Sequence, residues 1–120
     1  MSLLGSVAVD RVGPSSWVVE LRGEHDLSTV ETLRTELEAI FAQGTTVVID
    51  LSDATFVDSA VLNELIAAQR RVDADKNERL AVVAPRDGFP ARVLDLVNLD
   101  RLLSIFETRA EALRRLEASG

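Results

Sequence analysis

The sequence contains no cysteine, no tyrosine, one tryptophan and one histidine among 120 residues. Without cysteine the chain forms no disulfide, no zinc–thiolate site and no thiol nucleophile. Its six glycines are scattered, so neither a GxGxxG nor a GxxxxGKS phosphate loop occurs. No Ser-His-Asp set can be built without His25, and a lone histidine beside a strand end is usually structural. We therefore expect a protein that is not an enzyme.

The chain also has fewer basic than acidic residues, 13 against 20, and no long apolar run. Its net charge is −7, which argues against a nucleic-acid surface and against docking on anionic lipid. No apolar run approaches the roughly 20 residues of a membrane span, and Met1–Asp10 lacks the features of a signal peptide. We expect a cytoplasmic protein with no direct nucleic-acid contact, folded as a single domain over residues 1–120.

The first half of the chain begins with two strands and a helix. Ser6–Asp10 and Trp17–Arg22 alternate apolar and polar residues around a turn-rich stretch, which predicts an antiparallel hairpin. Apolar residues at helical spacing predict a helix from Ser28 to about Ala42. The later predicted elements are a strand at Leu80–Ala84, a helix ending near Val97, a strand at Leu102–Phe106 and a helix from Thr108 to about Ala118.

The most informative stretch lies between these parts. Val47–Leu51 is a short apolar run typical of a buried strand, and Asp53–Asp58 is predicted to be a loop. A helix follows, in which Val61, Leu62, Leu65, Ile66, Ala68 and Val72 recur at helical spacing. The predicted order is ββαβαβαβα. It indicates an α/β fold in which about four helices pack on a mixed sheet of about five strands.

Asp58 and Ser59 stand where this central helix begins. Either residue is a suitable N-cap, and a cap alone explains a serine at this position. The same geometry suits a phosphate, because a helix start offers free N–H groups and partial positive charge. A phosphoserine adds about −1.5 to −2 charge. We predict that the fold tolerates this change while a partner packed on Ser59 is expelled.

Asp50, Asp53 and Asp58 are a conceivable set of hard-metal ligands. Aspartates around a strand-to-helix connection are more often caps and turn formers. We therefore expect neither a metal site nor a cofactor.

Three segments resemble the anti-sigma factor antagonists, the small bacterial STAS domains. Asp50–Leu62 is similar to their phosphorylation motif, and Leu21–Thr29 is similar to their second-strand signature, usually Gly-Glu-Leu-Asp. The stretch from Phe89 to Leu113 is similar to the usual end of these domains. The resemblance covers nearly the whole chain and implies a STAS-like fold.

The resemblance also implies a partner-switching role in the regulation of transcription. The unphosphorylated antagonist would bind an anti-sigma factor that is also a serine kinase, and a sigma factor would be released. The kinase would phosphorylate Ser59 with its own ATP, and a phosphatase would restore the hydroxyl. The resemblance places the partner-binding surface at Glu24, Asp26, Asp58, Ser59, Ala60, Val61 and Leu62.

The sequence departs from the family pattern after Ser59. The family usually continues with Ser or Thr and then Gly, where this chain has Ala60 and Val61. We expect Val61 to be exposed and to suit a partner specific to this chain. Two alternatives stay open, a constitutive STAS scaffold or accessory module of a signalling or transport complex, and a small-ligand binder for a nucleotide or lipid. Exposed apolar positions on the strand-to-helix face would permit a weak homodimer.

Overall fold

The computed structural model describes residues 5–25, 27–43, 45–75 and 78–118. The strands within these ranges are β1 (Ser6–Arg11), β2 (Ser16–His25), β3 (Thr46–Asp50), β4 (Ala54–Val57), β5 (Arg79–Val83) and β6 (Ile105–Phe106). The helices are α1 (Leu27–Phe41), α2 (Ser59–Ala74), α3 (Phe89–Leu96), the 3-10 turn η1 (Leu99–Arg101) and α4 (Arg109–Ala118). None of the helices in these ranges is long and apolar enough to cross a membrane.

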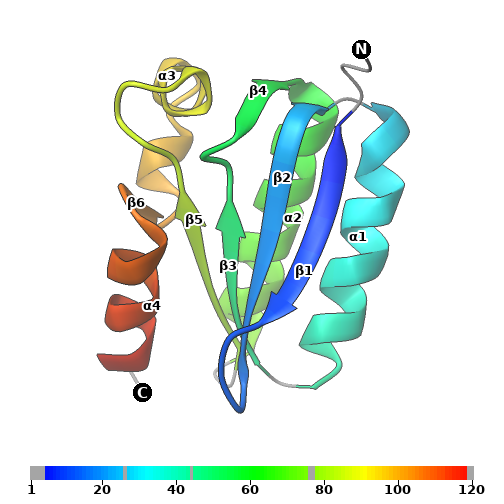
Figure 1. The fold of residues 1–120 in the computed structure, drawn as a ribbon, viewed down its shortest axis with the longest axis vertical. Coiled ribbons are helices and arrows are strands. Elements are labelled where there is room, and N and C mark those ends of the chain that lie inside the picture. Colours follow the sequence, from blue (N-terminus) through cyan, green and yellow to red (C-terminus); the bar gives the residue numbers. More distant parts are fainter. Residues whose placement is uncertain (1–4, 26, 44, 76–77, 119–120) are drawn as a thin grey trace.

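The strands form one mixed sheet in the order β1-β2-β3-β5-β6 (Figure 1). β1 pairs antiparallel with β2, and the pairs β2–β3, β3–β5 and β5–β6 are parallel. β4 pairs with the end of β2, beyond the point where β3 stops. The long strand β2 therefore holds two successive neighbours on the same side.

Helices cover both faces of the sheet. Neighbouring residues of a strand point to opposite faces, and the strands carry apolar side chains on both. Val19, Val47 and Ile49 pack into the main core with α1, α2 and α3, whereas Val18 and Val48 pack with α4 into a smaller core. Figure 1 shows α2 behind the strands, α1 beside β1, α4 beside β6, and α3 at the end of the molecule where β4 lies. The predicted α/β fold with a mixed sheet is confirmed.

Two of the predicted elements need correction. The stretch Asp53–Asp58 is not simply a loop, since it contains β4, and the order is ββαββαβαβα when η1 is left aside. The last strand is only Ile105–Phe106. Leu99 and Leu103 are buried in the main core. They lie in and after the 3-10 turn η1, which follows Asn98 with φ 60°. The chain therefore reaches the sheet later than predicted.

Candidate functional site

The passage from β3 to β4 brings the chain to the candidate site. At the end of β3, Leu51 N donates to Val83 O at 2.8 Å, and the chain then turns, with Ala54 N donating to Leu51 O at 3.1 Å. Gly23 N donates to Asp53 O at 3.0 Å, which fixes the start of β4 against β2. β4 then runs parallel to β2 and ends directly before Asp58.

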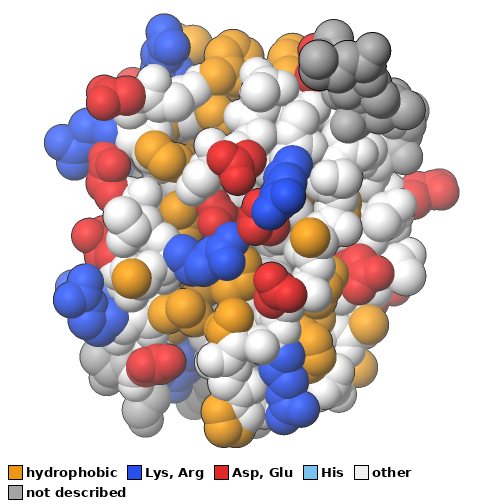
Figure 2. All heavy atoms as spheres, viewed as in Figure 1, with side chains coloured by type: hydrophobic (Ala, Val, Ile, Leu, Met, Phe, Trp, Pro, Cys, Tyr) orange, Lys and Arg blue, Asp and Glu red, His pale blue; other side chains and the backbone are white. Residues whose placement is uncertain are grey.

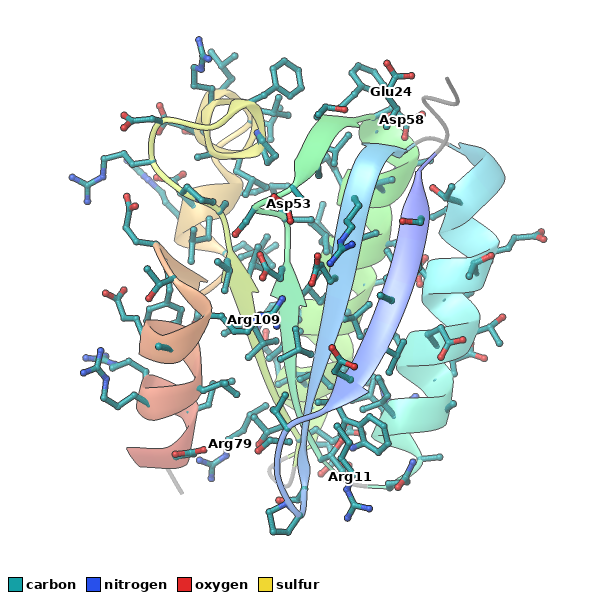
Figure 3. All side chains as sticks on the ribbon, viewed as in Figure 1. Arg11, Glu24, Asp53, Asp58, Arg79 and Arg109 are labelled. Atoms are coloured by element: carbon teal, nitrogen blue, oxygen red, sulfur yellow. The ribbon has the colours of Figure 1, made fainter. Side chains whose placement is uncertain are left out.

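A β-bulge in β2 sets the position of Glu24. Gly23 has φ 80°, a left-handed value that glycine adopts without steric cost. The register shifts there, so that Gly23 lies opposite Ala54 and Glu24 lies opposite Phe56. Bulges re-aim the side chains that follow them. Figure 3 shows the labelled side chains of Glu24 and Asp58 close to each other at this end of the molecule.

Asp58 caps α2 and leaves Ser59 free of that role. Its backbone is extended, with φ −100° and ψ −177°, and its side chain accepts from the first turn of the helix. Oδ1 accepts from Ala60 N at 3.0 Å and from Val61 N at 3.3 Å. Ser59 is the first residue of α2 and is exposed. Ser59 is therefore an exposed residue at a helix start, without being the cap.

The other predicted partner-binding residues divide into surface and core. Glu24 is exposed, and Asp58 and Ala60 are partly exposed at the same end of the molecule as Ser59. Leu62 is partly buried and packs against the main core. Asp26 lies outside the described residues.

The prediction that Val61 is exposed is wrong. Its exposed fraction is 0%, and it belongs to the main core with Leu65 and Ala68. The spacing of these three residues places them on one helix face, which packs toward the sheet. A valine in place of the family's usual glycine therefore fills the core and adds nothing to the surface on which a partner could bind.

An Asp58→Ala variant tests the assignment of the cap. It removes the acceptor for two first-turn N–H groups, and we expect the free energy of unfolding to fall by about 1 kcal/mol. The melting temperature should drop by about 4 °C, measured by circular dichroism. Asp58→Asn keeps an acceptor oxygen and should stay close to wild type. An unchanged melting temperature for Asp58→Ala would show that another group caps α2.

A charged cluster lies on the other face of the sheet, where α4 packs. Arg109, the first residue of α4, donates from Nη2 to Glu20 Oε2 at 2.7 Å and to Asp50 Oδ2 at 2.8 Å. Asp50 Oδ1 accepts from the Ser52 hydroxyl at 2.6 Å, and Arg22 pairs with Glu20. Glu20 lies opposite Asp50 in the register of β2 and β3. Figure 3 shows the labelled Arg109 near the centre of the sheet face, and Figure 2 shows acidic and basic side chains side by side in that region.

This cluster keeps both buried carboxylates ionised. Hydrogen bonds from Arg22 and then Arg109 hold the pKa of Glu20 below its ordinary value of 4.5. Burial alone would raise the pKa of Asp50, but the hydrogen bonds from Ser52 and Arg109 outweigh it and hold that pKa below 3.8. We interpret the cluster as a clasp between α4 and the sheet.

The three aspartates considered as metal ligands do not come together. Asp50 is paired with Arg109, and Asp58 caps α2. Among the described residues, no group of three or more acidic or histidine side chains is placed to hold a metal ion.

Sequence reasoning missed two features near this site. The run Ala54-Thr55-Phe56-Val57 is rich in strand formers, and that signal predicts β4. The Arg109 clasp had no local signal, because its partners are 59 and 89 residues away in the chain.

A family model described as "Mlab, STAS domain" matches residues 9–104. The chain belongs to the STAS family. This STAS domain has no match among curated proteins.

Solved structures of anti-sigma factor antagonists share the fold of this STAS domain. An anti-sigma factor antagonist from Mycobacterium paratuberculosis is 27% identical, with a TM-score of 0.83 and 95% of each chain covered. The anti-sigma factor antagonist SpoIIAA in its unphosphorylated form is 22% identical, with a TM-score of 0.77, covering 94% of this chain and 97% of that one. The Bacillus cell fate determinant SpoIIAA in its phosphorylated form is 22% identical, with a TM-score of 0.71, covering 92% and 99%.

Proposed function

We propose that this STAS domain is an anti-sigma factor antagonist controlled by phosphorylation of Ser59. Its unphosphorylated form binds an anti-sigma factor that is also a serine kinase, in the cytoplasm, and a phosphatase restores the hydroxyl. One observation carries the proposal: Ser59 is exposed at the first position of α2, while the neighbouring Asp58 caps that helix. The hydroxyl is open to a kinase and is not needed for the fold.

The charges around Ser59 support a switch that acts on binding. A phosphate there adds about −1.5 to −2 charge beside Asp58, at the end of the molecule that also carries Glu24. The start of α2 tolerates this charge because of the positive end of its helix dipole, although Asp58 already accepts from the N–H groups of Ala60 and Val61. A partner packed against the serine meets added bulk and a dianion that resists desolvation. The surface therefore changes while the fold remains.

Phosphate transfer tests the proposal directly. The protein is incubated with ATP and each purified histidine-kinase-like serine kinase encoded in the source genome, and intact mass is measured. We expect one added phosphate with the cognate kinase and none in Ser59→Ala. Ser15→Ala removes another exposed hydroxyl, from the turn between β1 and β2, and should still accept the phosphate. Absence of phosphate with every kinase would overturn the proposal.

Ala60 favours a second candidate function. Where the family usually has a second hydroxyl, this chain has a methyl group, so the family's phosphorylation motif is altered directly after Ser59. The domain would then be a constitutive accessory module of a protein complex. Partner binding that is unchanged in Ser59→Asp would distinguish this candidate from the switch.

A further inference from the structure

The helix α3 has apolar residues on two faces. Pro90 and Leu94 point into the protein and are buried. Phe89, Val93 and Leu96 of α3 recur at the spacing of a second face, and Val97 is the C-cap of the helix. Phe89, Leu96 and Val97 are 40%, 81% and 49% exposed. Val93 is partly buried against the main core, but core packing does not account for the exposed side chains of Phe89, Leu96 and Val97.

Phe56 of β4 extends this second face toward Ser59. Its side chain is 42% exposed, and its ring stacks on that of Phe89 with centroids 6.1 Å apart and an interplanar angle of 26°. We call Phe56, Phe89, Val93, Leu96 and Val97 the apolar ridge. Figure 2 shows hydrophobic side chains gathered at the end of the molecule where α3 and β4 lie. Contiguous exposed apolar surface of this kind marks interaction sites, and aromatic residues dominate binding energy at interfaces.

The rim of the apolar ridge is mainly acidic. Glu24 is the cross-strand neighbour of Phe56, and Asp58 follows β4. Asp87 precedes α3, and Asp95 lies within it. Two arginines, Arg86 and Arg92, are also exposed there, and Arg86 pairs with Glu107.

This charge pattern indicates which kind of protein could bind on the apolar ridge. Two copies of this chain, each of net charge −7, would bring acidic rims together, and like charges in an interface oppose binding. A different protein with an apolar centre and a basic rim is complementary.

We propose that the protein partner that contacts Ser59 also docks on the apolar ridge, with basic side chains on the acidic rim. This inference rests on the proposed function. The ridge begins three residues before Ser59 in the chain, so one partner surface can cover both. The ridge supplies most of the affinity, and the charge state of Ser59 decides whether the partner stays bound.

Binding to the purified histidine-kinase-like serine kinases of the source genome tests the inference. Dissociation constants are measured by calorimetry at two salt concentrations. The variant Leu96→Ser with Val97→Ser should bind about tenfold or more weakly. These side chains are largely exposed, so its melting temperature should be unchanged. Val12→Ser removes a similarly exposed residue (44%) from the hairpin turn and should bind like wild type. Glu24→Gln with Asp87→Asn should weaken binding at low salt and reduce its salt dependence.

The outcomes separate this inference from the proposed function. If Ser59→Asp abolishes binding and the ridge variant does not weaken it, the ridge inference is overturned and the switch stands. If the ridge variant loses binding and Ser59→Asp does not, the switch is overturned and the ridge stands. If no kinase binds the wild-type protein, both are overturned. A wild-type dimer in analytical ultracentrifugation that the ridge variant dissociates would assign the ridge to a second copy and overturn the inference.

Discussion

A Ser59→Asp variant is expected to bind its kinase partner about a hundredfold more weakly than wild type. The carboxylate stands in for part of the charge and bulk of a phosphate, and it lies beside Asp58 at the end of the molecule that carries Glu24. The fold should be unaffected, because an acidic side chain in the first turn of a helix is slightly stabilising. Calorimetric titration gives the affinity, and thermal unfolding of the same samples gives the stability.

Ser59→Asn is the matched control for this variant. Asparagine has nearly the size of aspartate and carries no charge, so it separates repulsion from bulk. We expect Ser59→Asn to retain most of the affinity. Equal loss in both variants would attribute the switch to steric exclusion. A matching loss of melting temperature in Ser59→Asp would contradict the view that the switch leaves the fold intact.

An Arg109→Met variant is expected to cause the largest loss of stability. It leaves the buried carboxylates of Glu20 and Asp50 without the guanidinium that bridges them. Glu20 keeps its pair with Arg22, but Asp50 is left as an uncompensated buried charge, at a cost of about 3 kcal/mol. The melting temperature should fall by about 10 °C. Arg114→Met, which changes an exposed arginine on the same helix, should stay close to wild type. Equal stability of the two variants would contradict the proposed clasp.

The pH dependence of stability gives this prediction a second readout. The folded-state pKa values of Glu20 and Asp50 lie below their ordinary values of 4.5 and 3.8. Their ionised forms therefore stabilise the fold fully above those values, and the contribution is lost as pH falls through the lowered pKa values. We expect the wild-type melting temperature to decline below about pH 5. The decline should be shallower in Arg109→Met, where Arg22 and Ser52 alone hold the two pKa values down.

Helices and strands of this protein followed closely from local sequence pattern. The hairpin, the strand at Thr46–Asp50 and the helix after Ser59 were predictable, because side-chain periodicity reports which face of an element is buried. The helix start at Asp58 and Ser59 was also local, since a cap involves groups only two or three residues apart. The resemblance to STAS domains drew on the same stretch.

The surface of the candidate site was less predictable. Val61 stands where the family usually has glycine, and the sequence placed it in the site without showing that its helix face packs on the sheet. Phe56 and Phe89 meet across 33 positions of the chain, and their stacking depends on how β4 pairs with β2.

The sequence by itself determined most of the helices and strands, the serine motif at a helix start and the absence of thiol chemistry, but not β4. Only the tertiary structure decided that Val61 is core, that Phe56 joins α3 in the apolar ridge and that Arg109 bridges Glu20 and Asp50. The physical reason is the range of the interactions. Caps and amphipathic faces depend on neighbours within a turn or two, whereas burial, aromatic stacking and ion pairing depend on which distant segments the sheet brings together.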